Sequence, residues 1–194
     1  PVACAVHLLS MIESDKFGAL AILGAGTQGI LVLILAKLLG YQSIFITDIN
    51  QDRLAIASQL GATQTLNPSE VDVASTIHDL TDGLGVEVVI DAVGSSPTRQ
   101  QATEICQPGG QVLLLGLAEQ KTEINFIDLV RKEIQLQTSF GYNMNDFAKA
   151  VSLVISGKVN ITPWTETKMI EEGQMAFEKM INNPGSIIKM ILRP

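Results

Sequence analysis

Cysteine and histidine are scarce in this chain of 194 residues, which holds two of each. Cys4 and Cys106 lie far apart, and His7 and His78 add no spacing typical of a metal site. Two isolated cysteines also do not form the disulfide framework of a small secreted domain. We therefore expect no metal site within this chain, and a reducing cytoplasm as its compartment.

Basic residues and long apolar runs are also few. The 13 Lys and Arg are outnumbered by 20 Asp and Glu, and the net charge of −7 argues against nucleic-acid or membrane-surface binding. The longest apolar run, residues 30–36, is shorter than the roughly 20 residues that a membrane span needs. Hydrophobic residues nevertheless make up 46% of the chain and aromatic residues only 5%, so we expect an ordered protein with a sizeable aliphatic core.

Short apolar runs alternate with helical patterns along most of the chain. Apolar strands separated by helices are typical of a parallel sheet covered on both faces, so we expect an α/β, doubly wound, six-stranded sheet. The expected strands are residues 19–23, 43–47, 63–66, 86–90, 111–115 and 134–138. Helices are expected at residues 29–39, 52–60, 69–80, 97–106 and 144–155, with Ser69 as a cap and Cys106 as a last helical residue.

The expected domain spans residues 1–157. Residues 158–194, with an expected helix around 171–181 and an expected strand at 187–192, fit no further βαβ unit. The chain opens at Pro1, without methionine and inside a helical pattern, so we expect it to be a fragment of a longer protein.

The most informative motif is the glycine-rich run at residues 24–29, between the first strand and the first long helix. Gly24 permits a tight turn, Gly26 lets a pyrophosphate approach the backbone, and Gly29 lets the helix pack closely on the strand. Asp48 ends the next strand, at the spacing where an acidic residue binds the adenosine ribose of a dinucleotide. The motif therefore predicts a dinucleotide site.

The same motif leaves two questions open. The alternative to a dinucleotide site is a structural glycine turn, with Asp48 capping the next helix. If the site is real, the N–H groups around Thr27 and Gln28 face the phosphates. Asp48 followed by Ile49 favours NAD over NADP because a carboxylate repels a 2′-phosphate. Arg53 is the reservation, with three roles open: its guanidinium reaches a 2′-phosphate, it lies along the adenine or ribose, or it is a solvated helix residue.

At this point the chain resembles the zinc-type medium-chain dehydrogenases, in particular sorbitol, threonine and other alcohol dehydrogenases. The pieces that carry the resemblance are residues 1–7, 24–29, Thr47-Asp48, Asp91-Ala92-Val93-Gly94, Pro108-Gly109-Gly110, Ser139-Phe140-Gly141-Tyr142, Asn183-Pro184-Gly185 and 189–194. The resemblance implies the coenzyme-binding half of a zinc-dependent alcohol or polyol dehydrogenase. The zinc and the proton-relay residues are then expected only in a preceding catalytic domain, and this half alone is expected to be inactive.

The resemblance also implies further coenzyme contacts. Val93 and Gly94 would flank the adenosine, and Gly116 and Leu117 the nicotinamide. Thr138 and Phe140 would hold the carboxamide, and Lys189 either lies near the pyrophosphate or is a surface residue of an edge strand. A homodimer or homotetramer is implied as well, paired through residues 135–137.

Several other residues are interpreted as structural. Cys4 and Cys106 are expected in packing, His7 in the core or an interface, and His78 in solvent, while Asp91 is expected to anchor backbone. The alternatives to the leading hypothesis are a zinc-free, NADP-dependent quinone or enoyl reductase of the same superfamily, and a nucleotide-sensing module without catalysis.

Overall fold

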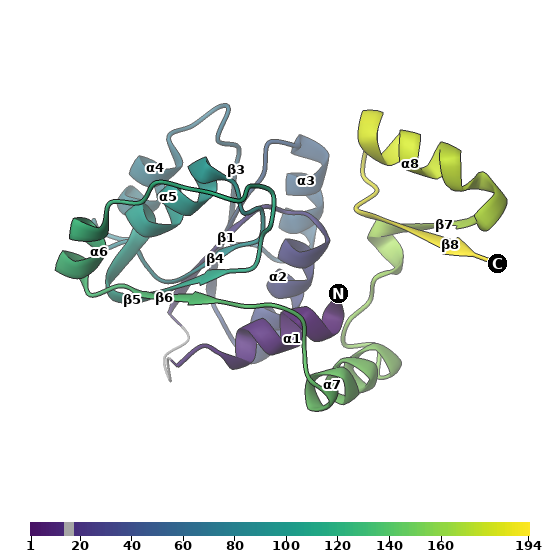
Figure 1. The fold of residues 1–194 in the computed structure, drawn as a ribbon, viewed down its shortest axis with the longest axis horizontal. Helices are drawn as coiled ribbons and strands as arrows, with labels where there is room; N and C mark the ends of the chain where they lie inside the picture. Colours follow the sequence, from purple (N-terminus) through teal and green to yellow (C-terminus); the bar gives the residue numbers. More distant parts are fainter. Residues whose placement is uncertain (14–17) are drawn as a thin grey trace.

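The computed structural model describes residues 1–13 and 18–194. Its main sheet has six parallel strands in the order β3-β2-β1-β4-β5-β6 (Figure 1). They are β1 (Ala19–Leu23), β2 (Ser43–Thr47), β3 (Gln64–Leu66), β4 (Val86–Asp91), β5 (Cys106–Leu114) and β6 (Gln135–Thr138). The expected doubly wound sheet is confirmed. Because β1 pairs with both β2 and β4, the chain reverses its direction of travel across the sheet there, where such folds form a crevice.

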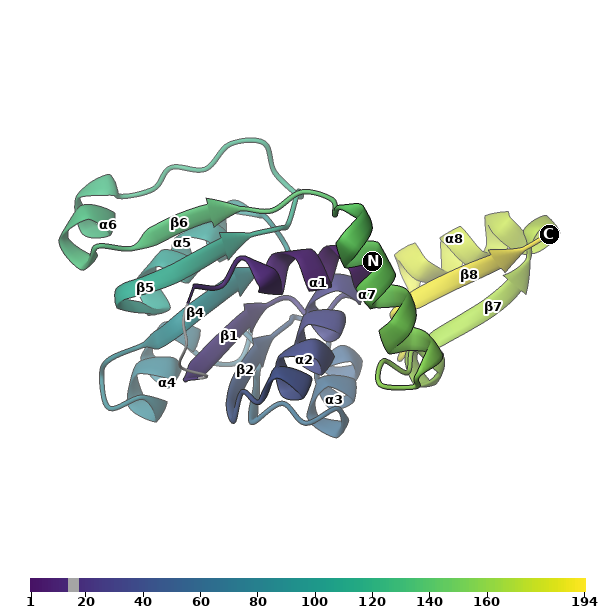
Figure 2. The ribbon, with the colours of Figure 1, turned by 90° about the horizontal axis from the view of Figure 1, so that it is seen from below.

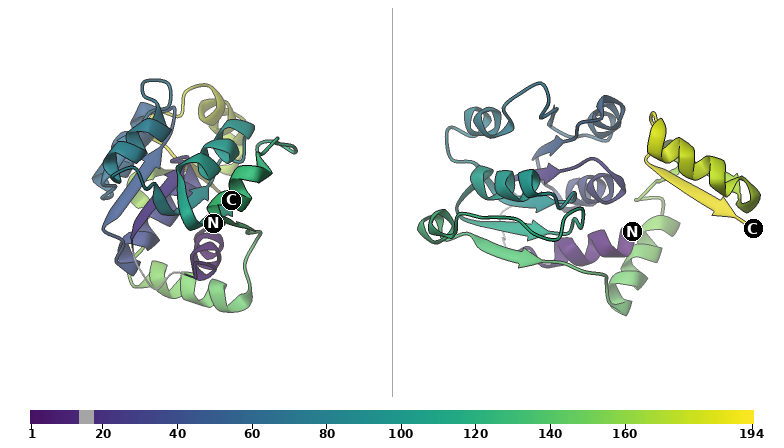
Figure 3. Two further views of the ribbon diagram at one scale, coloured as in Figure 1. Left: turned by 90° about the vertical axis from the view of Figure 1, so that its left-hand side faces the viewer. Right: turned by 45° about the horizontal axis from the view of Figure 1, so that its top comes forward.

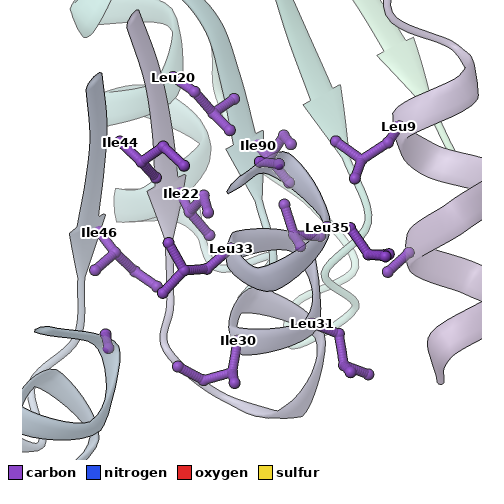
Figure 4. Packing of buried hydrophobic residues seen from close by; sticks show 14 of the residues in the cluster. Leu9, Leu20, Ile22, Ile30, Leu31, Leu33, Leu35, Ile44, Ile46 and Ile90 are labelled. Carbon is purple, nitrogen blue, oxygen red and sulfur yellow. The ribbon is translucent and has the colours of Figure 1, made fainter. Parts of the chain in front are cut away.

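Seven helices accompany this sheet among the described residues. They are α1 (Val2–Ser10), α2 (Thr27–Leu39), α3 (Gln51–Gln59), α4 (Val73–Leu80), α5 (Ser96–Ile105), α6 (Phe126–Lys132) and α7 (Met144–Ile155). Each β1 side chain points to the opposite face from its neighbour. Leu20 and Ile22 pack against α1 and α2 (Figure 4), whereas Ala21 and Leu23 pack in the cluster that holds residues of α4 and α5. Helices therefore cover both faces of the sheet (Figure 2).

The C-terminal segment contains an unexpected βαβ unit. Strands β7 (Thr165–Met169) and β8 (Lys189–Arg193) are parallel and form a separate sheet, with α8 (Gly173–Asn182) between them in sequence (Figure 2; Figure 3 shows α8 beside the main sheet). Short 3-10 turns, η1 (Thr162–Trp164) and η2 (Ile170–Glu172), precede and follow β7. The expectation that residues 158–194 hold no such unit is wrong, because the β7 sequence is polar and lacks the apolar run of a buried strand.

Two further expectations fail at element ends. The fourth helix begins at Val73, not beside Ser69, because the Asp72 side chain accepts a hydrogen bond from Ser75 N at 3.1 Å and caps it. Cys106 is the first residue of β5 instead of the last residue of a helix. There the Lys132 ammonium donates to the carbonyl oxygens of Glu104 at 2.8 Å and Cys106 at 3.3 Å. These hydrogen bonds give partners to carbonyl groups at the C-terminal end of α5.

Cys106 is nonetheless structural, as expected. Its side chain is buried, and burial raises the pKa of the thiol to about 12, so it stays protonated at neutral pH.

Among the described residues, no helix is long and apolar enough to span a membrane.

Candidate functional site

The glycine turn joins β1 to α2 at the carboxyl edge of the main sheet. Gly24 has a φ of +99°, which favours glycine, and its N–H donates to Thr47 O at 2.8 Å. A Cβ on Gly29 would collide with Gly24 O, so only glycine lets the helix pack this closely on the turn. These are the roles that the sequence motif assigns to both residues.

Gly26 lies at the N-cap of α2 and leaves the helix end open. No side chain caps α2, and a Cβ built on Gly26 would meet no atom within 4 Å. The first N–H groups of a helix have no intrahelical acceptor and carry the positive end of its dipole. The side chains at this end are half-buried: Thr27 Oγ1 donates to Ile188 O at 3.2 Å, and Gln28 Oε1 is buried without a hydrogen-bond partner.

Asp48 lies beside this turn, directly after β2. Its Oδ2 accepts from Ala25 N at 2.8 Å, and its Oδ1 accepts from Asn50 N at 2.9 Å. The side chain is only 9% exposed, and Arg53 Nη1 lies 3.8 Å from Oδ2. Two backbone N–H groups and one guanidinium therefore fix the carboxylate at the edge of the site.

The arrangement around Asp48 bears on the alternatives from the sequence. Helix α3 is capped by Asn50, whose side chain accepts from Arg53 N at 3.1 Å, so Asp48 is not the cap. Arg53 is held against Asp48 and is not a freely solvated residue, whereas Ile49 is exposed. The Asn50 cap could have been predicted, because Asn is a strong N-cap residue and lies two positions before the expected helix start at residue 52.

The loops after β4 and β5 meet at the same edge. Asp91 is fully buried, and its Oδ1 accepts from both Val93 N and Gly94 N at 2.9 Å, as expected of a backbone anchor. Its backbone oxygen accepts from Leu115 N and from Gly116 N, each at 2.9 Å.

The two loops also touch each other and the glycine turn. A Cβ on either Gly94 or Gly116 would collide with the backbone of the other loop, and a Cβ on Gly24 would lie 2.6 Å from Val93 Cγ2. Leu117, beyond the contact, is exposed. Predicted residues from three separate segments are thus brought together.

The end of β6 and the C-terminal segment hold the remaining predicted residues. Thr138 is exposed at the end of β6, and Phe140 is 86% exposed two residues later. Between them Ser139 is buried, and its hydroxyl has no hydrogen-bond partner among the described residues. The family resemblance includes Ser139 in its motif but gives it no role. Lys189 is exposed on β8, outside the main sheet, and lines a pocket of about 270 Å³ together with Thr27.

Histidine and cysteine do not contribute to this edge. His7 Nδ1 lies 2.9 Å from Asp146 Oδ2, a side-chain hydrogen bond between α1 and α7. The two residues are 139 positions apart, and no pattern in the sequence pairs them. The Asn143 N–H, and then His7, hold the pKa of Asp146 below its usual value. His78 and Cys4 are half-buried, and in the described part of the chain no three His, Cys, Asp or Glu side chains could hold a metal ion.

Unpartnered buried atoms cluster at the same edge. Four of the buried side-chain atoms without a partner among the described residues are Gln28 Oε1, Arg53 Nε, Asp91 Oδ2 and Ser139 Oγ. Buried polar groups without partners are rare and often mark a ligand or water position. The open space at Gly26, the free N–H groups of α2 and the Asp48 carboxylate fit a ligand with a phosphate and neighbouring hydroxyls.

The chain is similar to known proteins in both sequence and structure. The zinc-binding dehydrogenase family model matches residues 29–156. A zinc-type alcohol dehydrogenase-like protein of Escherichia coli is 30% identical over 194 residues, covering 100% of this chain and 55% of that protein. The sorbitol dehydrogenase of Halalkalibacterium halodurans is 30% identical over 198 residues, covering 100% and 57%.

Solved structures agree with this likeness. A Bacillus subtilis 2R,3R-butanediol dehydrogenase has a TM-score of 0.89 at 26% identity, covering 100% of this chain and 56% of that one. A Sinorhizobium meliloti protein solved with NADP has a TM-score of 0.89 at 28% identity, covering 100% and 57%. The chain spans about half the length of the relatives it matches. With a family match over most of its residues, the chain belongs to the zinc-binding dehydrogenase family.

Proposed function

We propose that this chain is the NAD-binding part of a zinc-dependent alcohol or polyol dehydrogenase. The observation that carries the proposal is the Asp48 carboxylate, fixed by Ala25 N at 2.8 Å beside the open N-terminus of α2. A pyrophosphate at Gly26 then places the adenosine ribose next to Asp48. Relatives named xylulose reductase, butanediol dehydrogenase and sorbitol dehydrogenase support alcohols or polyols as the substrate class.

In this proposal the residues of the chain bind and orient the coenzyme. The α2 N–H groups hold the pyrophosphate, and the Asp48 carboxylate accepts hydrogen bonds from the ribose hydroxyls. Val93 and Gly94 flank the adenosine side, while Leu117 and Phe140 face the nicotinamide. When bound, the nicotinamide supplies the hydride acceptor.

The remaining roles are shared between the C-terminal segment, residues 158–194, and a domain outside this chain. Zinc and the substrate pocket belong to a catalytic domain, and residues 158–194 pack on that domain. Phe177 and Ile181 of α8 support this division because they are large, apolar and exposed. Lys189, beside Thr27 in the lining of one pocket, approaches the pyrophosphate.

The proposed preference for NAD rests on charge. A 2′-phosphate beside the Asp48 carboxylate meets like charge, and Arg53, 3.8 Å from that carboxylate, offsets only part of the repulsion. A zinc-free NADP reductase remains the alternative, and one similar structure does contain NADP.

The direct test is Asp48→Asn, measured by titrating the chain with NADH and with NADPH and following nicotinamide fluorescence. We expect NADH to bind about tenfold more weakly because charge-assisted hydrogen bonds to the ribose are lost, whereas NADPH binding stays equal or improves. Asp52→Asn is the matched control, because it removes an exposed carboxylate at the start of α3. Equal NADH binding by Asp48→Asn and the wild type would overturn the ribose assignment.

We also propose a homodimer or homotetramer that pairs through β6. This strand lies at one edge of the main sheet, and its Leu136 is 37% exposed. The neighbouring α6 presents Phe126, Ile127 and Val130 as further exposed apolar residues. Sedimentation equilibrium should give a dimeric or larger mass that Leu136→Lys reduces to the monomer, and a monomeric wild type would contradict the proposal.

A cytoplasmic location belongs to the same proposal. It is supported by Cys4 and Cys106, which are both free thiols. Cell fractionation tests it, and recovery of the protein outside the cytoplasm would contradict it.

A further inference from the structure

A second concave site lies away from the carboxyl edge of the sheet. It is a cavity of about 510 Å³ among the second half of α1, the last turns of α2 and the middle of α7. Helix α2 begins at the glycine turn and ends here, and its 13 residues separate the two sites by about 20 Å. The cavity is therefore distinct from the proposed coenzyme site, and its volume lies within the roughly 300–1,000 Å³ range of small-molecule sites.

The walls of this cavity are mainly aliphatic. Leu9 of α1 and Leu35 of α2 face each other across the helix pair (Figure 4) and belong to the lining. Leu38 and Leu39, at the end of α2, are 49% and 47% exposed. Covering such residues with a hydrocarbon chain is favourable by about 25 cal/mol per Å² of apolar surface. The walls thus favour an aliphatic group.

The rim of the cavity is positively charged. Lys149 of α7 and Lys158 line it, and its remaining polar residues are the two serines Ser10 and Ser152. No acidic residue belongs to the lining, although the whole chain carries a net charge of −7. Among the described residues neither lysine forms an ion pair or a side-chain hydrogen bond.

Asp146 is the acidic residue whose charge interacts with Lys149, and it is engaged elsewhere. Its Oδ2 lies 2.9 Å from His7 Nδ1 and accepts from Asn143 N at 3.1 Å. It does not line the cavity. Both rim ammonium groups are therefore available to an anionic ligand.

We propose that this cavity binds a free aliphatic carboxylate of medium chain length. The methylene groups lie along the leucines, and the carboxylate lies between the Lys149 and Lys158 ammonium groups. A fully polar anion would leave the leucines exposed to water, and an aliphatic cation would meet the lysines. The combination of walls and rim therefore selects an amphiphilic anion.

Isothermal titration calorimetry with decanoate, below its micelle concentration and at low salt, tests the proposal. We expect one saturable site per chain, weaker binding as salt is added, and at least about tenfold weaker binding of decyltrimethylammonium, which has the same chain and the opposite charge. Lys149→Gln/Lys158→Gln should weaken decanoate binding by about tenfold. The matched double variant Lys121→Gln/Arg131→Gln removes two distant charges and should bind as the wild type does.

A steric variant separates the cavity from general surface binding. Ser152 is exposed on α7 and lines the cavity, so Ser152→Phe fills it and should abolish decanoate binding while NADH titration stays unchanged. Decanoate binding that survives Ser152→Phe, or no saturable binding to the wild type, would overturn the proposal. A third outcome would also overturn it: the wild type binds no decanoate but self-associates, and Ser152→Phe abolishes that self-association. The occupant of the cavity is then a second copy of the chain.

Discussion

Gly29→Ala should unfold at a much lower urea concentration than the wild type, although alanine is the better helix former. Intrinsic helix propensity favours alanine over glycine by about 1 kcal/mol inside a helix. Gly29 lies inside α2, so propensity alone predicts a more stable protein. The packing predicts the reverse, because the added Cβ would collide with Gly24 O.

The collision should decide the outcome because neither partner can move cheaply. Gly24 belongs to a turn whose N–H is bonded to Thr47 O, and α2 is packed on the sheet by buried residues such as Ile30 and Leu33. Relieving the overlap means displacing backbone, so we expect the free energy of unfolding to fall by about 3 kcal/mol. Urea denaturation followed by circular dichroism measures the loss.

Gly26→Ala is the matched control in the same turn. Its φ of −72° is allowed for alanine, and the added Cβ meets no atom within 4 Å. Stability should change by less than about 1 kcal/mol, which is the scale of an N-cap substitution. If the proposed pyrophosphate occupies this space, NADH binding should nevertheless fall by at least about tenfold. If Gly29→Ala and Gly26→Ala have the same free energy of unfolding, the turn rearranges around the added Cβ at little cost and the prediction is wrong.

Local rules explain why so much of the fold and site could be predicted. Residues 19–23 are a continuous apolar run and residues 43–47 are rich in β-branched and aromatic residues, and their predicted bounds match β1 and β2. The Gly24–Gly29 turn and Asp48 follow these strands directly, so parallel pairing alone brings them to one edge. Each of these inferences depends on residues close in sequence or on the direction of neighbouring strands.

The predictions that were wrong or missing concern features for which the local sequence allows more than one structure. Ser69 and Asp72 are both good N-caps, but Ser69 N donates to Asn67 Oδ1 in a turn, which leaves Asp72 to begin α4. Strand β7 is polar because its sheet has only two strands and remains partly exposed. Ser139 and the contact between the Gly94 and Gly116 loops depend on tertiary packing, which no single-sequence pattern encodes.

Asp91→Ala should destabilise the protein and weaken NADH binding together. The carboxylate is fully buried, and its Oδ1 accepts from Val93 N and Gly94 N. Its removal leaves two N–H donors without that acceptor, at a cost of about 1–3 kcal/mol for each donor that stays unsatisfied. The Val93–Gly94 loop touches the Gly116 loop and the Gly24 turn, so its displacement should disturb the proposed coenzyme site.

Two variants distinguish this positioning role from simple loss of a buried residue. Asp91→Asn keeps an oxygen acceptor for both N–H groups, so it should recover most of the stability and NADH affinity. Asp79→Ala removes an exposed carboxylate from α4 and should behave as the wild type does.

The informative measurements are urea denaturation, NADH titration, and hydrogen exchange at the amides of Val93 and Gly94. In Asp91→Ala these two amides should exchange faster than in the wild type, whereas the amides of the central strand β1 should be less affected, because the loop opens before the sheet does. NADH should bind at least about tenfold more weakly to Asp91→Ala, and within about threefold of the wild type to Asp91→Asn. Unchanged exchange at both amides in Asp91→Ala would show that the side chain does not fix the loop, whatever happens to binding. Equal loss of NADH affinity in the two Asp91 variants would instead assign the effect to the unpartnered Oδ2, the atom that asparagine replaces with an amide nitrogen.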